Sequence, residues 1–177
     1  MAKKCILVLG GARSGKSHFA QELADKLGKK VLFVATGEAL DGEMKARIKQ
    51  HQESRPQSWQ TLEAPTNLAQ QIERHLGDSS IIVIDCITLL VSNLLGDEPD
   101  YVGAESNITV AINALITCMD KLDASFIIVS NEVGLGIVPE NKSARIYRDL
   151  LGKANQFLAQ NIDEVYLMVA SIELRIK

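Results

Sequence analysis

Short apolar runs alternate with amphipathic stretches along most of this 177-residue chain. Uninterrupted apolar runs predict strands buried on both faces, whereas apolar residues at three- and four-residue spacing predict helices. The predicted strands cover residues 6–9, 31–35, 59–63, 80–85, 126–130, 165–169 and 174–176. This alternation predicts an α/β fold of three layers, in which a mostly parallel sheet carries helices on both faces. The last two strands, joined at Ala170-Ser171, predict an antiparallel hairpin at the C-terminal edge of the sheet.

The first apolar run ends in a glycine-rich stretch that leads into a predicted helix. This stretch reads Gly10-Gly11-Ala12-Arg13-Ser14-Gly15-Lys16-Ser17 and fits the phosphate-loop pattern G-x-x-x-x-G-K-[ST]. In such a loop the backbone N–H groups and the lysine contact the phosphates of a nucleotide, and the serine hydroxyl ligates Mg²⁺. Lys16 is therefore a candidate catalytic residue and Ser17 a candidate metal ligand. The alternative is an ordinary glycine-rich turn, but the flanking strand and helix favour a phosphate loop.

Polar residues also follow three later strands, at the edge of the sheet where α/β proteins bind ligands. The second strand leads into Ala35-Thr36-Gly37, and the strand over 80–85 ends at Asp85. An acid at that place holds Mg²⁺ in phosphate-loop enzymes, although Asp85 could instead cap the following helix. Asn131 and Glu132 follow the next strand, where they could contact substrate, help to place Mg²⁺ or simply form a turn.

A single histidine, His51, extends the apolar stripe of the helix predicted before Pro56. Taken alone, a histidine at such a place is more often structural than catalytic. The neighbouring Arg47 and Arg55 supply groups that bind phosphate and so favour a role in a nucleotide site.

Composition narrows the class of protein. At this length and 46% hydrophobic residues, one compact domain spanning residues 1–177 is expected. A net charge of -3 without a basic block argues against a nucleic-acid partner. Cys5, Cys86 and Cys118 lack the paired spacing of zinc or redox sites, and no apolar run reaches the length of a membrane span. We therefore expect a cytoplasmic protein.

Several stretches together resemble the bifunctional adenosylcobinamide kinase / adenosylcobinamide-phosphate guanylyltransferase family of cobalamin biosynthesis. The matching pieces are the loop over 10–17, Ala35-Thr36, Ala46-Arg47-Ile48 with His51 and Arg55-Pro56, Trp59, Asp85-Cys86-Ile87-Thr88 with Ser92-Asn93-Leu94-Leu95, and Asn-Glu-Val-Gly-Leu-Gly-Ile-Val-Pro-Glu-Asn at 131–141. They follow the family's order over nearly the whole chain. The best-known members have two adjacent histidines where this chain has Gln50 and His51.

The resemblance implies a phosphate-loop NTPase fold with a RecA-like sheet and two reactions. A nucleoside triphosphate, ATP or GTP, phosphorylates the aminopropanol arm of adenosylcobinamide. GTP then gives its guanylyl group to His51, and adenosylcobinamide phosphate takes that group to form adenosylcobinamide-GDP. The resemblance also implies a homotrimer, with Mg²⁺ held by Ser17 and Asp85. It assigns the nucleotide site to residues 10–17, Ala35, Thr36, Gly37, Gln52, Glu53, Ser54, Arg55, Glu63 and Asp85.

Two rival interpretations use the same phosphate loop. One is a simple kinase for another small metabolite, in which His51 is structural. The other is a nucleotide-sensing protein without catalytic activity, in which the loop acts as a switch. Covalent labelling by GTP carrying label in its α-phosphate distinguishes the guanylyltransferase from both rivals.

Overall fold

The computed structural model describes residues 3–28, 30–38, 56–96 and 101–177. The strands are β1 (Cys5–Gly10), β2 (Val31–Ala35), β3 (Gln60–Glu63), β4 (Ile81–Asp85), β5 (Ser125–Val129), β6 (Glu164–Val169) and β7 (Ile172–Arg175). The described helices are α1 (Lys16–Leu27), α3 (Leu68–His75), α4 (Ile87–Leu95), α5 (Tyr101–Lys121) and α6 (Lys142–Gln160). Each predicted strand is present; the bounds of β2 agree with the prediction, and those of the other strands differ by at most two residues.

The seven strands form one sheet in the order β3-β2-β4-β5-β1-β6-β7. Neighbouring strands are parallel from β3 to β6, and only β7 runs antiparallel to its neighbour. The structure therefore confirms the mostly parallel sheet and its antiparallel C-terminal hairpin. The short strand expected near an edge is β3, which closes the opposite side of the sheet.

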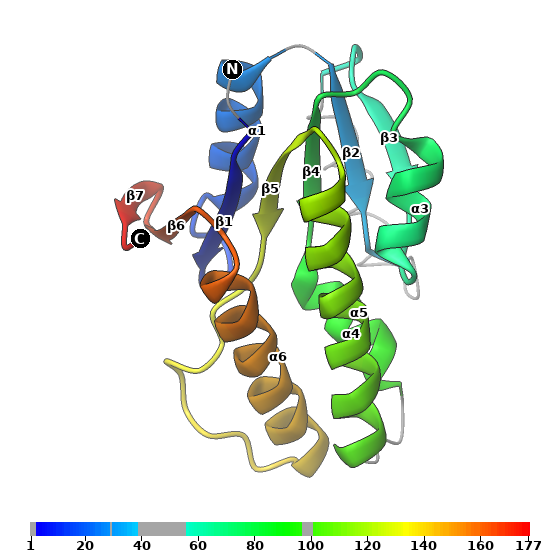
Figure 1. Ribbon diagram of the computed structural model, residues 1–177. Helices are drawn as coiled ribbons and strands as arrows, with labels where there is room; N and C mark the ends of the chain where they lie inside the picture. Colours follow the sequence, from blue (N-terminus) through cyan, green and yellow to red (C-terminus); the bar gives the residue numbers. More distant parts are fainter. Residues whose placement is uncertain (1–2, 29, 39–55, 97–100) are drawn as a thin grey trace.

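Helices cover both faces of this sheet, as the three-layer prediction requires (Figure 1). Alternate residues of β1 point to opposite faces: Ile6 and Val8 pack in a cluster with α1, whereas Leu7 packs with α3 to α6. Because both faces are covered, the inner strands are apolar throughout instead of alternating with polar residues.

The longest helix, α5, begins at Tyr101, seven positions before the first residue of its predicted apolar stripe, Ile108. By length and composition alone α5 could cross a membrane. Its stripe is instead buried against the sheet and neighbouring helices; it consists of Ala104, Ile108, Ile112, Leu115, Cys118 and Met119. In this fold α5 is a core helix.

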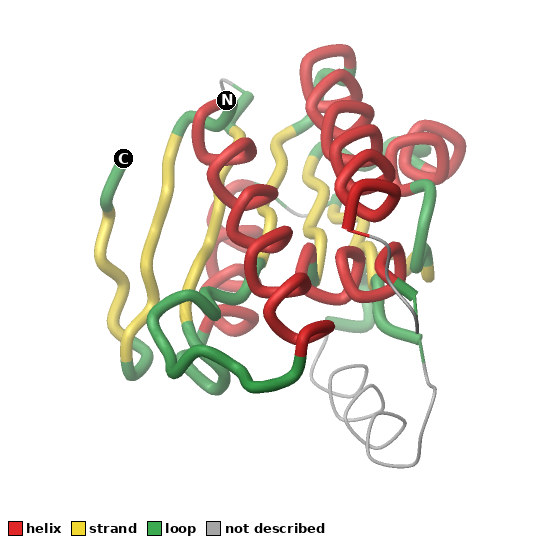
Figure 2. Tube along the Cα trace, turned by 90° about the horizontal axis from the view of Figure 1, so that it is seen from below, coloured by secondary structure: helices red, strands yellow, loops and turns green. Residues whose placement is uncertain are grey.

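The parallel strands end at a single edge of the sheet, which Figure 2 views from below. The phosphate loop after β1, the segments after β2 and β4, and the loop from β5 to α6 all leave the sheet there. Topology therefore gathers the described candidate residues at one edge.

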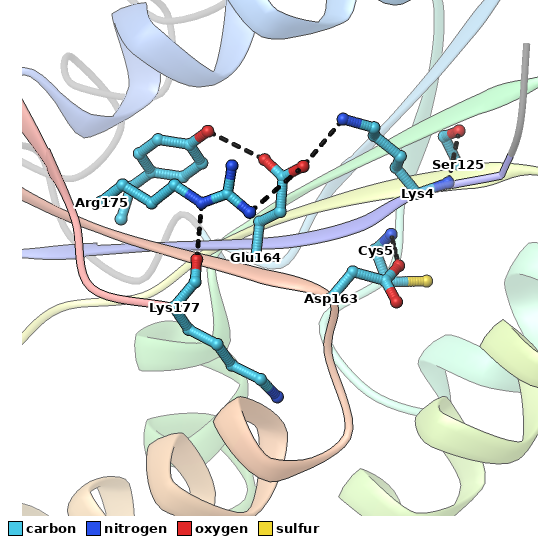
Figure 3. Close-up of polar contacts among 8 residues, drawn as sticks. Lys4, Cys5, Ser125, Asp163, Glu164, Arg175 and Lys177 are labelled. Carbon is cyan, nitrogen blue, oxygen red and sulfur yellow. Dashed lines mark hydrogen bonds and ion pairs between the residues drawn. The ribbon is translucent and has the colours of Figure 1, made fainter.

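A polar network lies at the other ends of β1 and β6 (Figure 3). The buried carboxylate of Glu164 accepts hydrogen bonds from Lys4 Nζ at 2.8 Å and from the Tyr166 hydroxyl at 2.8 Å. Arg175 Nη2 of β7 lies 3.7 Å from the same carboxylate. These contacts join β6 and β7 to the residue before β1, far along the strands from the phosphate loop.

Candidate active site

The phosphate loop connects β1 to α1, and two of its glycines are required by geometry. Gly10 has φ +152° and Gly15 has φ +96°, values that side-chain-bearing residues rarely adopt. A Cβ on Gly10 would lie 2.6 Å from the Met168 carbonyl oxygen, and one on Gly15 would lie 2.8 Å from Ser171 Oγ. Gly15 is also the N-cap of α1, so the positive end of the helix faces the loop.

Lys16 is the first residue of α1, and its side chain is folded over the loop. Its Nζ donates to the Gly11 carbonyl at 2.6 Å and reaches Ser14 Oγ at 3.4 Å. The residue is buried, with 7% of its surface exposed. A phosphate oxygen would form a stronger, charge-assisted bond with this ammonium than the neutral carbonyl does. The Lys16 ammonium thus lies over the loop that is predicted to bind phosphate.

Thr36 joins the end of β2 to the end of β4. Its hydroxyl donates to the Cys86 carbonyl at 2.7 Å and accepts from the Cys86 N–H at 2.8 Å. Its own N–H donates to the Asp85 carbonyl at 3.2 Å. Thr36 is fully buried, so the structure places it beneath the surface of the predicted nucleotide site, with the half-buried Gly37 following it.

Asp85 ends β4 directly opposite Ala35 of β2. The N-cap of α4 is Cys86, which makes no side-chain capping bond, so Asp85 does not cap the helix as the alternative interpretation proposed. Its half-buried carboxyl group shares the carboxyl edge of the sheet with the Ser17 hydroxyl. No cluster of three or more His, Cys, Asp or Glu side chains suited to a metal occurs in the described part of the chain. Ser17 and Asp85 carry oxygen atoms of the kind that Mg²⁺ prefers, and Mg²⁺ is usually held by one or two protein oxygens together with phosphates and water.

The pKa of the Cys86 thiol responds to the charged groups around the end of β4. Burial raises the pKa of Cys86 to about 11, and the Asp85 carboxylate adds to the increase. The positive charge of the Lys16 ammonium lowers the same pKa. Among the groups that shift this pKa, Lys16 makes the smallest contribution.

Glu63 is a predicted nucleotide-site residue on β3, the outermost strand on one side of the sheet. It ends β3 and lies opposite Ala35 in the parallel register, with an exposed side chain. The structure therefore places Glu63 beside the Ala35-Thr36-Gly37 segment. His51 and the four residues Gln52, Glu53, Ser54 and Arg55 lie outside the described residues.

The segment after β5 is fixed to the phosphate loop through its backbone. The Glu132 N–H donates to the Gly10 carbonyl at 3.0 Å, and the Asn131 N–H donates to Thr88 Oγ1 at 2.7 Å. The Glu132 carboxylate accepts from the Gly134 N–H at 2.5 Å. The side chain of Glu132 therefore stabilises a turn, as one of the predicted alternatives had it. Its backbone N–H stabilises the phosphate loop.

Sequence reasoning named Asn93 and Ser171 but missed the part that each plays in holding the site together. The amide of Asn93 donates to the carbonyls of Thr36 and Pro65, at 2.9 and 3.0 Å. A lone amide within the apolar α4 sequence was the available signal. The Ser171 N–H donates to the Ser14 carbonyl at 2.9 Å, which a hairpin signal alone does not reveal.

Two buried polar atoms near the same edge have no hydrogen-bond partner within the described ranges. They are Ser130 Oγ, directly after β5, and Asn155 Oδ1 of α6, whose Nδ2 donates to the Asn131 carbonyl at 3.0 Å. Such atoms are commonly paired with ordered water or a ligand. They had no distinctive signal in the sequence.

A solved structure shares the fold but little sequence. The flagellar accessory protein FlaH from Methanocaldococcus jannaschii matches with a TM-score of 0.54 and 13% identity, over 98% of this chain and 78% of that chain. At this identity the likeness concerns the fold alone, and it supports the predicted α/β class.

Similarity to curated proteins extends over nearly the whole chain. This chain is 41% identical over 180 residues to the bifunctional adenosylcobalamin biosynthesis protein CobU of Escherichia coli (strain K12). The match covers 97% of this chain and 99% of the relative. CobU of Salmonella typhimurium is 43% identical with the same coverage, and CobP of Pseudomonas aeruginosa is 40% identical over 97% of this chain and 96% of the relative. A sequence model of the family described as cobinamide kinase / cobinamide phosphate guanyltransferase matches residues 6–176. These matches confirm the resemblance found in the sequence, and the chain belongs to the cobinamide kinase / cobinamide phosphate guanyltransferase family.

Proposed function

We propose that this chain catalyses the two reactions for which its family is named. It phosphorylates adenosylcobinamide with a nucleoside triphosphate and then transfers GMP from GTP to adenosylcobinamide phosphate. The main structural support is the ordered phosphate loop, in which Lys16 Nζ lies 2.6 Å from the Gly11 carbonyl, at the same edge of the sheet as the β4 terminus. Family membership supplies the identity of the acceptor.

In the first reaction the loop binds the triphosphate and the acceptor hydroxyl attacks the γ-phosphorus. The bond between the γ-phosphorus and the bridging oxygen breaks, the nucleoside diphosphate leaves, and the acceptor gains the phosphoryl group while its hydroxyl proton is released to solvent. Lys16 and the N-terminal amides of α1 stabilise the charge on the transferred group and on the leaving oxygen. Mg²⁺, when held by Ser17 and Asp85, would neutralise phosphate charge.

In the second reaction an imidazole nitrogen of His51 attacks the α-phosphorus of GTP. A P–N bond forms, the bond to the β-phosphate oxygen breaks and pyrophosphate leaves. A phosphate oxygen of adenosylcobinamide phosphate then attacks the same phosphorus, the P–N bond breaks, and neutral histidine is restored. The products are adenosylcobinamide-GDP and the starting enzyme.

The nucleotide site that we propose joins described and undescribed segments. Residues 10–17 bind the phosphates. Ala35, Thr36, Gly37 and Glu63 lie at or just after the ends of β2 and β3 and extend the site there. Gln52, Glu53, Ser54 and Arg55 extend the site beyond His51. The register that aligns Ala35 with both Glu63 and Asp85 supports a continuous surface of strand ends for this site.

Labelling with GTP that carries ³²P in its α-phosphate tests the covalent step. The wild-type protein is expected to retain acid-labile label, and His51→Ala to retain none while keeping part of its kinase activity. His75→Ala is the matched control, because His75 is exposed and its Nδ1 lies 2.9 Å from the Gln71 carbonyl of its own helix. Label retained by His51→Ala at wild-type stoichiometry would place the nucleophile elsewhere. No label on wild type, with γ-phosphate transfer intact, would identify a simple kinase.

The proposal includes the setting in which the enzyme works. We propose a cytoplasmic homotrimer that uses GTP and ATP and has no nucleic-acid or membrane partner. Light scattering of the purified protein tests this assembly, and a mass of one or two chains would contradict it.

A further inference from the structure

An open groove of about 610 Å³ lies along the outer face of α6. It is bordered by Gly134, Gly136 and Val138 of the loop after β5, by Arg148 and Gly152 of α6, and by Tyr101 of α5. Its volume falls within the range of about 300–1,000 Å³ that is usual for small-molecule sites. The reactions proposed above require a second site, for the acceptor, and so far no residue serves it.

The chain segment that borders the groove also contacts the phosphate loop. The Glu132 N–H donates to the Gly10 carbonyl at 3.0 Å, and the Glu132 carboxylate accepts from the Gly134 N–H at 2.5 Å. Gly134 in turn borders the groove. One border of the groove therefore lies two residues along the chain from Glu132, whose backbone contacts the phosphate loop.

Gly152 occupies the interior of α6, where glycine destabilises a helix relative to alanine. A Cβ built on Gly152 would meet no atom within 4 Å among the described residues. Packing of the described chain therefore gives no reason for a glycine here. Close approach of a ligand to the helix backbone would supply one, because the missing Cβ leaves the floor of the groove open.

Arg148 provides the groove with a cation that the fold scarcely uses. Only 21% of its side chain is exposed, and within the described residues its guanidinium is paired with Asp149 alone. Both Nε and Nη2 lie 3.5 Å from Asp149 Oδ1, at the outer limit of a hydrogen bond. The neighbouring Lys153, by contrast, bonds both Glu105 and the Tyr101 hydroxyl. Arg148 therefore has donors left for an anion.

Three apolar side chains of the bordering loop are exposed: Leu135 by 85%, Ile137 by 96% and Val138 by 58%. Adjacent exposed apolar residues on a loop beside a groove indicate a binding surface. The ligand should therefore offer an apolar face as well as an anionic group.

We propose that this groove binds the corrinoid acceptor, an inference that rests on the proposed function. The aminopropanol arm lies over Gly152, and the corrin ring, which is too large for the groove, covers the apolar loop residues. Arg148 binds the phosphate of the acceptor in the second reaction. A corrinoid fits all three features, because it combines an apolar macrocycle face with a narrow arm that ends in phosphate after the first reaction.

Equilibrium dialysis of cobinamide and of cobinamide phosphate against the full-length protein tests the proposal. Gly152→Ala should weaken binding of both by at least about tenfold, because one added methyl group occupies space that the arm needs. The same change should raise the Tm by about 2–4 °C, since alanine favours the helix. Greater stability with weaker binding is an outcome that a purely structural role would not produce.

Arg148→Gln should separate the two ligands. Binding of cobinamide phosphate should weaken by about tenfold or more, through loss of a charge-assisted bond, whereas binding of cobinamide should change less than about threefold. Arg74→Gln, on the exposed side of α3, is the matched control and should bind both ligands as wild type does. Labelling from α-labelled GTP without acceptor is measured alongside, so that a damaged nucleotide site is recognised.

Wild-type affinities in Gly152→Ala and Arg148→Gln would overturn the proposal. So would equal weakening of both ligands by Arg148→Gln, or a change of oligomeric state in Gly152→Ala with unchanged corrinoid affinity, which would assign the groove to a contact between copies. If wild type itself neither binds nor converts a corrinoid, the proposed function fails. Corrinoid turnover in wild type with unaffected groove variants would refute only the groove.

Discussion

Single hydroxyl and amide groups hold the strand ends of the site together. The fully buried Thr36 hydroxyl acts as donor and acceptor toward the Cys86 backbone, at 2.7 and 2.8 Å. Asn93 adds a bond to the Thr36 carbonyl at 2.9 Å. Because buried polar groups are costly when unpaired, these residues keep their bonds and so fix the position of Asp85 relative to Ala35.

Lys16→Ala is expected to remove activity while leaving the fold in place. The ammonium is the group that meets phosphate charge in both reactions, so kcat/KM should fall by at least about 10²–10³ in each. Circular dichroism melting should show a Tm within a few degrees of wild type. Lys26→Ala, at an exposed position of the same helix, should change neither quantity. Near-wild-type turnover of Lys16→Ala would contradict the phosphate-loop assignment.

Asp85→Asn tests the metal role of the β4 terminus. Asparagine keeps the size of the side chain but loses the negative charge, so the Mg²⁺ concentration for half-maximal activity should rise by about tenfold or more. A titration of activity with Mg²⁺ measures this directly. Asp25→Asn on the exposed side of α1 serves as the control. An unchanged Mg²⁺ requirement in Asp85→Asn would leave Asp85 without a role in metal binding.

At the scale of elements, the sequence predicted what depends on local patterns. The inner strands were recognisable because both faces of the sheet are covered, which makes these strands apolar throughout. The phosphate loop was recognisable because its glycines are dictated by backbone geometry. The contact between the hairpin turn and the phosphate loop could not be recognised, because the turn residues carry no information about the segments that they contact. The early start of α5 at Tyr101 was missed because its first turn contributes little to the apolar stripe.

The β6–β7 turn contains avoidable strain. Ala170 and Ser171 have φ of 51° and 63°, in the left-handed region where two-residue hairpin turns favour Asn-Gly. Ser171→Gly should therefore stabilise the protein by about 1 kcal/mol, because glycine adopts this conformation without steric cost. Differential scanning calorimetry should show a Tm about 2–4 °C higher.

Ser171→Pro gives the contrasting case. Proline cannot adopt a positive φ, and it lacks the N–H that donates to the Ser14 carbonyl at 2.9 Å. It should lower the Tm and, through the displaced phosphate loop, weaken nucleotide binding. A Ser171→Gly protein less stable than wild type would show that the serine side chain outweighs the backbone strain.

At the scale of the whole molecule, the two ends of the parallel strands have different roles. The carboxyl edge holds the glycine-rich loop, the strand ends and the loop that borders the groove proposed for the acceptor. The network of Lys4, Glu164, Tyr166 and Arg175 lies at the other ends of β1 and β6. Strand order decides this arrangement, and it could not be derived from the sequence, because pairing between strands depends on contacts between distant segments.

Glu164→Gln should therefore lower stability and leave nucleotide binding intact. The hydrogen bond from Lys4, followed by that from Tyr166, lowers the pKa of the Glu164 carboxyl group. A lowered folded-state pKa contributes stability above the unfolded-state pKa of about 4.3, and this contribution is lost as the pH falls through the folded-state value. At pH 7 the Tm of Glu164→Gln should be lower than that of wild type by about 2–6 °C, and the difference should shrink as the pH falls below about 4. Glu173→Gln, exposed on β7, should match wild type at every pH. A Tm difference that stays constant down to low pH would show that Glu164 acts through packing and not through its charge.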